Sequence, residues 1–488
     1  MSSQVIQPTE YDIIWSIVNK ARCYKTLQHQ HLIEVDINNR HELLQIGSEA
    51  FKNWVIYKLS SLGHKINAEG MANIISRLNA KVWAIDKKIE VHSRIARSSK
   101  AIYYNLGNKN GEIVRVTPNG YSFVPSKNCI VKFINSNNMK EQCKPRRDKD
   151  IGIFDLQKYL NIKSPETLRL LLIYIVSCFI PKIAHPILIT TGSHGAAKTT
   201  SNVLIKKLVD PALADIISLP RDKRDLFVQL NKGYMLFYDN IKKINPEFND
   251  VFCQASTGGY QIARKLYTDD DIVTYKLQRC LLLNGIGNLT DQPDLLDRAI
   301  SIRYERIGET VRMTEQELYT NFNQDLPYFL NDIFNIVSGA MKIIDSVKLD
   351  NLPRMADFAR WGYAIAEVMG IGGGNFIKYY KANQLGLGLE LIESNTTAMT
   401  IIGFMKREKV WKGSVKAFWE LINDFAIRKN INRNDHTWAK NENSLSRRMT
   451  EIKVNLEEQG VFFTKKNVGH YKELHICYEK PHSVAKKA

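Results

Sequence analysis

The sequence has no apolar run long enough to cross a membrane as a helix. Its longest candidate, 170–180, is about half of the roughly 20 residues that a span requires, so we interpret it as a buried helix. The first residues are polar and lack the apolar centre of a secretory signal peptide. Internal repeats and long low-complexity stretches are also missing. We therefore expect a cytoplasmic globular protein of 488 residues, without a membrane partner and with two to four domains.

Cysteine is scarce and scattered. The seven cysteines form no C-x-x-C pair. An odd, scattered set in a chain without a signal peptide is typical of free thiols in a reducing compartment. Closely spaced cysteine and histidine pairs are the usual sequence sign of a zinc site. The spacing here does not favour such a site.

Acidic residues are fewer than basic ones, 50 against 68, which gives a net charge of +18 and a pI near 9.4. This excess favours a polyanionic partner, most simply nucleic acid, although a generally basic surface would give the same total. The distribution says more, because residues 401–488 hold 18 Lys and Arg against 10 Asp and Glu. That net charge of +8 points to DNA contact in the C-terminal part.

The pattern of apolar residues divides the chain into four regions. Residues 1–150 are predicted to form an α+β domain, with strands at 101–106 and 112–116, to which the sequence assigns no role. Residues 151–310 alternate helices with short apolar strands, and residues 311–385 are helical. Residues 386–488 combine helices, one of them at 443–458, with a final basic hairpin, and Gly386 and Gly388 are expected helix breaks. Helices followed by such a hairpin are typical of a winged helix.

The second region predicts a parallel α/β core. Its short apolar strands are separated by helical stretches, as parallel pairing requires. The five proposed strands are 186–191, 215–219, 234–238, 280–283 and 299–304. A glycine-bearing loop follows the first strand and leads into a stretch with helical spacing.

That loop has the composition of a phosphate-binding loop. Small residues let backbone N–H groups close around a phosphate, the helix N-terminus adds positive potential, and Lys198 reaches the terminal phosphates. The usual pattern has glycine where this chain has Ala197, and alanine tolerates left-handed backbone angles poorly. A plain strand–turn–helix with a chance lysine is the alternative. The residues assigned to the nucleotide are Gly192, Ser193, His194, Gly195, Ala196, Ala197, Lys198, Thr199 and Thr200.

Polar residues at the ends of later strands extend this prediction. Asp239 is suited to hold magnesium with the Thr199 hydroxyl, although alone it would fit a helix cap. Asn284 could sense the terminal phosphate or orient the attacking water, or simply form an Asn-Gly turn. Arg298, just before a strand, could stabilise transition-state charge in a neighbouring subunit, or form a surface salt bridge.

In this order the motifs resemble those of AAA+ ATPases. They resemble more closely the superfamily 3 and minichromosome-maintenance-like helicases of mobile genetic elements, including genomic-island replication initiators. The resemblance is most specific from 154 to 306 and continues more weakly to the C-terminal winged helix. It rests on Gly192–Thr200, Asp239-Asn240, Asn284, Asp297-Arg298 and a hairpin-like stretch at 258–276.

The resemblance implies a ring, usually a hexamer, with ATP and Mg²⁺ bound between subunits. It implies that Lys198 neutralises phosphate, that Asn284 is the first sensor and that Arg298 acts on a neighbouring subunit's nucleotide. Thr199 and Asp239 would hold the Mg²⁺. A 3′ to 5′ polarity of translocation is likewise implied by the resemblance alone.

Two further residues are candidates for the nucleotide site. Arg354 is a candidate second sensor, with helix capping or a surface role as the alternative. Asn240 is counted as catalytic, but it stands where the family usually has a glutamate that activates water. An amide positions water and cannot take its proton. Another acid would then supply the base, or positioning and electrostatics would carry most of the reaction.

Two sets of basic residues are predicted to contact DNA. The cations of the 258–276 hairpin would grip a strand in the ring channel, unless the hairpin only packs between subunits. The second set lies on the recognition helix and wing of the winged helix, where a protein-binding face is the alternative. The residues are Arg264, Lys265 and Lys276 in the hairpin, and Arg447, Arg448, Lys465 and Lys466 in the winged helix.

The sequence thus predicts an ATP-driven, hexameric DNA helicase that initiates replication of a mobile element. One alternative keeps the ATPase ring but has it remodel or load a replication complex without unwinding. A second is a DNA-binding regulator with a degenerate nucleotide switch, which Ala197 and Asn240 would suit.

Overall fold

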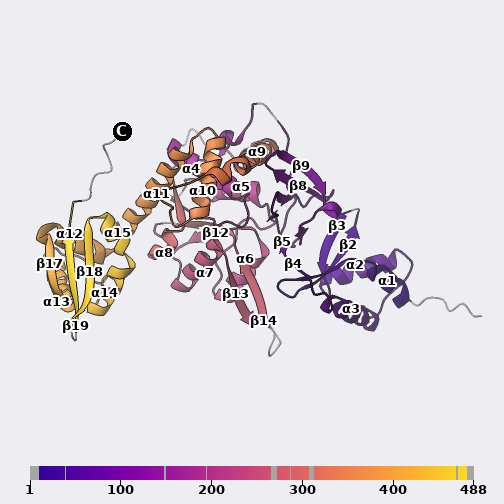
Figure 1. Ribbon diagram of the computed structural model, residues 1–488, viewed down its shortest axis with the longest axis horizontal. Helices are drawn as coiled ribbons and strands as arrows, with labels where there is room; N and C mark the ends of the chain where they lie inside the picture. Colours follow the sequence, from indigo (N-terminus) through magenta and orange to yellow (C-terminus); the bar gives the residue numbers. More distant parts are fainter. Residues whose placement is uncertain are drawn as a thin grey trace, which may run out of the picture.

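The computed structural model describes residues 10–38, 40–147, 150–193, 195–264, 272–285, 287–306, 313–468 and 471–480. The N-terminal and C-terminal units lie at opposite ends of a central α/β body (Figure 1). Within these residues, no helix combines the length and apolar character that a membrane span needs.

The N-terminal unit packs three helices on a small mixed sheet. Ser48 accepts a hydrogen bond from the Phe51 N–H and so begins α2, and Asn67 caps α3 in the same way. The helices bury one face each against the sheet, in a core of their own. The elements are α1 (Glu10–Val18), β1 (Cys23–Thr26), β2 (His31–Ile37), β3 (Arg40–Gln45), α2 (Glu49–Ser60), α3 (Ala68–Trp83) and β4 (Lys88–Ile89), with strand order β3-β2-β1-β4.

An antiparallel meander follows and joins the central body. The strands predicted at 101–106 and 112–116 are confirmed as β7 and β8. Tyr104 and Val114 share one hydrophobic cluster with helices that lie beyond residue 150. The domain boundary proposed at 150 therefore divides elements that share a core. The strands are β5 (Val91–His92), β6 (Ile95–Arg97), β7 (Ile102–Asn105), β8 (Glu112–Thr117), β9 (Gly120–Pro125) and β10 (Lys132–Phe133).

The central body is built on a four-stranded parallel sheet with the order β12-β15-β11-β16. Four of the five predicted strands are confirmed: β11 (Ile187–Gly192), β12 (Met235–Ile241), β15 (Cys280–Gly285) and β16 (Ala299–Tyr304). The strand predicted at 215–219 is wrong, since only Ile217 forms a bridge, to Tyr238. The Asp215 carboxylate accepts a hydrogen bond from the Ala212 N–H, which bends the chain just before the bridge.

Helices cover both faces of this sheet (Figure 1). The helical region predicted after residue 310 is confirmed, but the breaks expected at Gly386 and Gly388 are wrong. One helix continues through both. A Cβ at Gly388 would lie 2.9 Å from side-chain atoms of Asn455 and Glu458, so glycine there allows the close approach of those residues. The helices are η2 (Ile153–Tyr159), α4 (Pro165–Ser177), α5 (Lys198–Val209), α6 (Lys223–Lys232), α7 (Pro246–Thr257), α8 (Pro293–Leu296), α9 (Glu315–Ile343), α10 (Ala356–Val368) and α11 (Gly373–Glu393).

The C-terminal unit combines helices with a three-stranded antiparallel sheet of order β17-β19-β18. Its core is separate from that of the central body. The single helix predicted at 443–458 is divided at Ile452, and the strand β17 was not foreseen. The elements are α12 (Thr396–Glu408), β17 (Val410–Ser414), α13 (Val415–Arg428), α14 (Glu442–Glu451), α15 (Lys453–Glu458), β18 (Val461–Val468) and β19 (Tyr471–Tyr478).

Candidate functional site

Polar side chains meet at the carboxyl edge of the parallel sheet. The Thr199 hydroxyl, in the first turn of α5, donates to Asp239 Oδ2 over 3.0 Å. Asn284 Nδ2 donates to Asp239 Oδ1 and lies 3.3 Å from Thr199 Oγ1. Asp239 and Asn284 stand near the ends of the neighbouring strands β12 and β15, and Thr199 lies in the helix that follows β11. They meet because the carboxyl ends of parallel strands share one edge.

The loop before α5 has the backbone shape that its small residues permit. Gly192 has a φ of +145°, and a Cβ there would lie 2.3 Å from the Tyr304 carbonyl oxygen. Gly195 has a φ of +76°. Ala197 is left-handed, with φ 58° and ψ 26°, which costs a non-glycine residue about 1–2 kcal/mol. The position that usually holds glycine therefore keeps the conformation that glycine favours.

Lys198 lies at the mouth of this loop. Its Nζ donates to the Gly192 carbonyl over 2.7 Å and to the Ser193 carbonyl over 2.8 Å. The ammonium group thus lies above the loop and the N-terminus of α5, where both would attract an anion. His194, which the sequence assigned to the same loop, lies outside the described residues.

The cluster offers oxygen ligands of the kind that Mg²⁺ prefers. Asp239 contributes a carboxylate and Thr199 a hydroxyl, both half-buried. Asn284 Oδ1 is buried and has no hydrogen-bond partner among the described residues. An unpaired buried oxygen is costly, and a ligand or its water shell would satisfy it. The residues present therefore fit a hydrated magnesium ion.

Asn240 has an exposed side chain and a left-handed backbone, with φ 56°. Its N–H donates to Asp239 Oδ1 over 2.9 Å, which helps to orient the carboxylate. Asparagine adopts this conformation more readily than most residues. The local backbone therefore suits an asparagine at this position.

Arg298 and Arg354 lie together at the opposite edge of the sheet. Arg298 directly precedes β16, whose first residue pairs with Ile187 at the start of β11. Six strand residues, roughly 20 Å, separate this edge from the loop. The structure therefore does not bring these arginines to the phosphate loop of their own chain.

Two aspartates hold the arginine pair. Arg298 Nη1 lies 2.6 Å from Asp294 Oδ2. Arg354 contacts Asp294 and lies 3.1 Å from Asp297 Oδ2. Burial alone would raise the pKa of Asp294, but its hydrogen bond to Arg298 and the two positive charges outweigh burial and lower it.

The hairpin of β13 (Gly259–Arg264) and β14 (Ile272–Leu277) is paired over its whole described length. Lys276 forms an ion pair with Glu90, which also holds Lys182 at 2.8 Å. The base of the hairpin is thus fastened to the segment between β4 and β5. Lys265 lies outside the described residues, as does the side chain of Arg264.

The basic residues of the C-terminal unit fall into two groups. Arg448 donates to the His436 carbonyl over 2.7 Å, and Lys465 donates to Thr450 Oγ1 over 2.8 Å. Both therefore have partners within the unit. Lys466 is exposed, and Arg447 is 71% exposed, with only a long contact to Glu451 at 3.7 Å. These two are the predicted DNA-binding residues that face solvent here.

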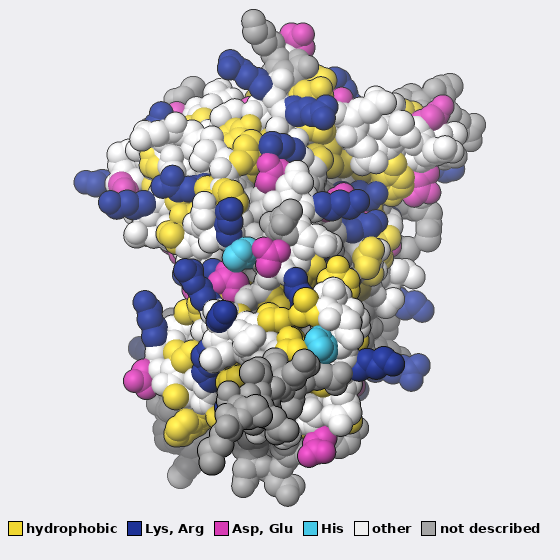
Figure 2. All heavy atoms as spheres, turned by 90° about the vertical axis from the view of Figure 1, so that its right-hand side faces the viewer, with side chains coloured by type: hydrophobic (Ala, Val, Ile, Leu, Met, Phe, Trp, Pro, Cys, Tyr) yellow, Lys and Arg dark blue, Asp and Glu magenta, His cyan; other side chains and the backbone are white. Residues whose placement is uncertain are grey.

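Basic side chains are not confined to the predicted DNA-binding residues. On the face at the N-terminal end of the molecule, lysine and arginine are spread widely, with acidic side chains between them (Figure 2). This face therefore shows no single patch that would define a path for DNA.

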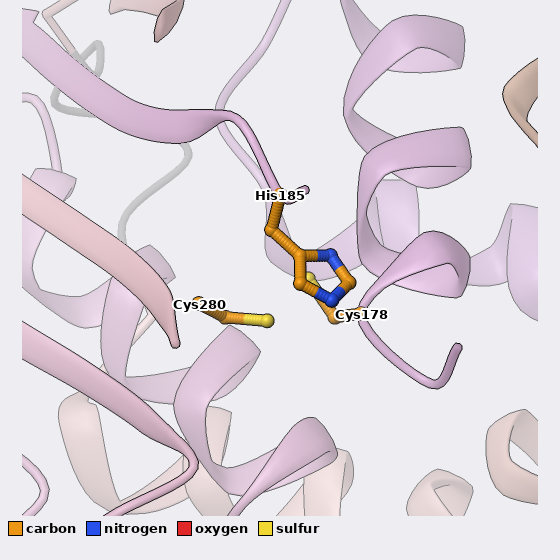
Figure 3. Close-up of side chains that lie close together, drawn as sticks. All are labelled: Cys178, His185 and Cys280. Atoms are coloured by element: carbon orange, nitrogen blue, oxygen red, sulfur yellow. The ribbon is translucent and has the colours of Figure 1, made fainter. Parts of the chain in front are cut away.

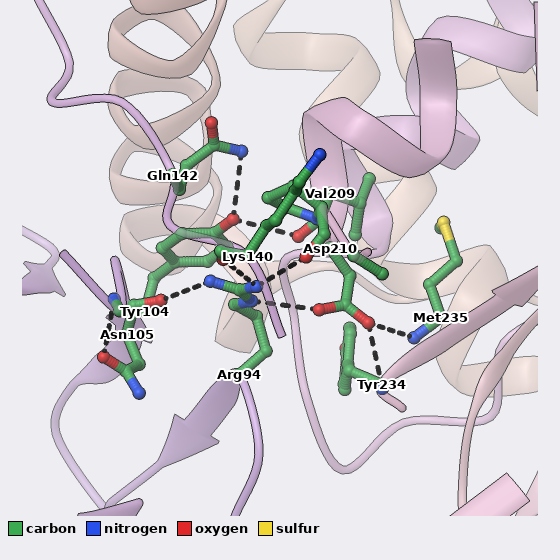
Figure 4. A network of polar contacts seen from close by, with 12 residues as sticks. Arg94, Tyr104, Asn105, Lys140, Gln142, Val209, Asp210, Tyr234 and Met235 are labelled. Atoms are coloured by element: carbon green, nitrogen blue, oxygen red, sulfur yellow. Dashed lines mark hydrogen bonds and ion pairs between the residues drawn. The ribbon is translucent and has the colours of Figure 1, made fainter. Parts of the chain in front are cut away.

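Sequence reasoning missed two polar links between units. Asp291 Oδ2 contacts Lys243 at 2.5 Å and His436 at 3.0 Å, which joins the central body to the C-terminal unit. Arg94, from the meander, is fully buried and contacts Asp210 at the end of α5 (Figure 4). Neither link has a sequence signal, because each joins residues more than a hundred positions apart.

Comparisons with known proteins identify the class of this chain. The family model for the replication protein of actinomycete integrative conjugative elements matches residues 153–383. The model for the C-terminal domain of that RepA protein matches residues 397–484. The class is therefore that of replication proteins of mobile elements. The chain contains regions that match both domains of the RepA proteins of actinomycete integrative conjugative elements.

A solved structure shares the fold at low identity. The structure titled "SCCmec type IV Cch - active helicase" is 10% identical, with a TM-score of 0.50. The alignment covers 94% of this chain and 93% of that one. The NrS-1 C-terminal region is 11% identical with a TM-score of 0.42, over 96% and 98% of the two chains. No curated protein matches the chain.

Proposed function

We propose that this chain is an ATP-driven DNA helicase that initiates replication of its mobile element. The observation that carries the proposal is the cluster of Thr199, Asp239 and Asn284 beside the Lys198 loop. This is the set of groups that a magnesium–nucleotide site needs. The match to a replication-protein family model and a fold shared with a helicase support the same reading.

We assign each residue at the loop a separate role in nucleotide hydrolysis. Lys198 would leave the Gly192 and Ser193 carbonyls and neutralise the terminal phosphates. Asp239 and Thr199 would hold Mg²⁺, which supplies charge neutralisation between the phosphates when bound. Asn284, which donates to Asp239, would contact the terminal phosphate and so act as the first sensor.

An AAA+ ring, proposed here as a hexamer, would complete the site. In a single chain Arg298 and Arg354 lie about a strand length from the loop, at the other edge of the sheet. In a closed head-to-tail ring, one surface of each subunit contacts a different surface of the next subunit. Such a contact would bring the Arg298 and Arg354 pair to the neighbour's phosphates.

The C-terminal unit runs helix, strand, three helical segments and a two-stranded hairpin, an order that supports the proposal of a winged helix. We assign α14 as the recognition helix, because Arg447 on it faces solvent. Lys466 on the wing would contact the phosphate backbone. Arg448 and Lys465 would instead hold the wing and helix in place.

The test is a DNA-stimulated ATPase assay and a forked-duplex unwinding assay on the purified chain. Lys198→Ala and Asp239→Ala should lose most hydrolysis and unwinding, whereas the exposed Lys232→Ala should match wild type. Forks with only one free tail test the proposed 3′ to 5′ polarity.

Two outcomes separate the alternatives. DNA-stimulated hydrolysis without strand separation would replace the helicase with an ATPase that loads or remodels a replication complex. Equal phosphate release from wild type and Lys198→Ala would remove the hydrolysis claim altogether.

A further inference from the structure

Three soft metal-ligand side chains meet at the amino edge of the parallel sheet, away from the phosphate loop. Cys178 ends α4, His185 lies just before β11, and Cys280 is the first residue of β15. Their candidate ligand atoms all lie within 4.8 Å of one another. Figure 3 shows the two sulfur atoms close to the imidazole ring.

The His185 ring lacks the partners that a buried imidazole normally has. The residue is 1% exposed, and neither ring nitrogen has a hydrogen-bond partner of normal geometry among the described residues, although the Cys280 thiol lies close to the ring. Its backbone is fixed, since its N–H donates to the Ser256 carbonyl over 3.0 Å and its carbonyl accepts from the Ser256 hydroxyl over 2.6 Å. An anchored, buried ring with two unpaired nitrogens needs a further partner.

We propose that Cys178, His185 and Cys280 bind a structural zinc ion. Two thiolates and a neutral imidazole are ligands that zinc takes in structural sites. Binding would convert two thiols to thiolates and release two protons, so the ion and its ligands carry no net charge. That neutrality makes the site compatible with complete burial, which an uncompensated ion is not.

The geometry is close to what the ion requires. Zinc–sulfur bonds of about 2.3 Å and zinc–nitrogen bonds of about 2.0 Å place tetrahedral ligands roughly 3.5–3.8 Å apart. The present separations, at most 4.8 Å, need only a small rotation of the side chains to close. Burial raises the pKa of Cys280 well above its usual range, so without a cation this thiol is neutral.

A buried tyrosine hydroxyl lies beside the three proposed zinc ligands. The Tyr174 hydroxyl is buried beside Cys178 and has no hydrogen-bond partner among the described residues that meets normal geometry. Once a thiolate forms there, this hydroxyl can donate to it or take the fourth ligand position. Tyr234 donates to the Cys178 carbonyl over 2.7 Å and fixes the end of α4. The ion would thereby tie α4, β11 and β15 together.

The direct test is the metal content of the full-length chain, purified in reductant without chelator. We expect about one zinc per wild-type chain, and at least a tenfold loss in Cys178→Ser and Cys280→Ser. Cys253→Ser is the matched control, because Cys253 is also buried in the central body but lies outside the cluster. The Tyr174→Phe variant should keep the zinc but bind it more weakly in a chelator competition.

Cobalt(II) exchange into the wild-type chain gives a second readout that does not depend on any variant folding. Tetrahedral thiolate-bound cobalt should produce sulfur-to-metal charge-transfer bands and intense visible bands. The proposal is overturned if wild type holds under a tenth of an equivalent of zinc and shows no such bands after reconstitution. A Cys178–Cys280 disulfide in chain isolated in reductant would overturn it too.

Discussion

Replacing Arg94 with methionine should weaken the contact between the meander and α5. Methionine keeps much of the length and loses the charge and all donors. Arg94 Nε lies 2.9 Å from Asp210 Oδ1, and the arginine is fully buried. Its guanidinium also donates to the carbonyl groups of Asn105, Leu106, Lys140 and Pro211 (Figure 4).

The size of the effect follows from what Asp210 retains. Removing one partner of a buried ion pair costs about 3–5 kcal/mol when the other charge is left uncompensated. Asp210 would keep Lys206 at 3.1 Å and the N–H groups of Tyr234 and Met235, each at 3.0 Å. We therefore expect the lower end of this range, about 3 kcal/mol, which is a factor of about 10² in an opening equilibrium.

Hydrogen exchange of the α5 amides measures that opening locally, which suits a chain whose several cores need not unfold together. Exchange across 198–209 should accelerate about 100-fold in Arg94→Met. Arg115→Met, on an exposed position of β8, should change it by less than a factor of three. The amides of α2 and α3, in a separate core, should not change in either variant.

Equal α5 exchange in Arg94→Met and Arg115→Met would refute this reasoning. The pH dependence adds a check. Burial alone would raise the pKa of Asp210, but Lys206, Arg94 and the Met235 N–H outweigh it and hold the pKa far below its usual value. Because a lowered carboxyl pKa stabilises the fold above the unfolded value, the Arg94→Met deficit should stay constant from pH 5 to 8.

Three further changes test the site and its supports. Ala197→Gly should slow hydrogen exchange of the α5 amides by up to about fivefold, which corresponds to about 1 kcal/mol, because relief of left-handed strain exceeds glycine's entropy cost; faster exchange would contradict it. At Asn240, alanine should lower ATP turnover about tenfold and glutamate should raise it above wild type; unchanged rates in both would exclude a role in positioning water. Burial raises the pKa of Glu90, but its hydrogen bonds to Lys182 and Lys276 outweigh burial and lower it to about 2. Glu90→Gln should therefore speed up hydrogen exchange of the β14 amides above pH 5. The difference in exchange rate from wild type should fade between about pH 4.5 and 2. An unchanged exchange rate of β14 at pH 7 would count against this.

Local sequence patterns were enough to predict the elements that carry the candidate nucleotide site. Four of the five strands were confirmed because each combines a short apolar run with flanking turn residues. The exception, 215–219, has apolar residues too, but the Asp215 side chain bends the chain and leaves one bridge. The sequence predicts a helix break at Gly388. Its missing side chain instead allows α15, which is distant along the chain, to approach α11 closely.

The sequence by itself determined the order of the motifs and the family, because the loop, Asp239 and Asn284 follow strands whose pattern is local. Only the tertiary structure decided which side chains meet. It fixed Asn284 against Asp239, and it placed Arg298 with Arg354 at the far edge of the sheet. It also gathered Cys178, His185 and Cys280, whose spacing predicts no metal site. The physical reason is that parallel pairing brings strand ends together across a hundred residues, and spacing along the chain does not record that pairing.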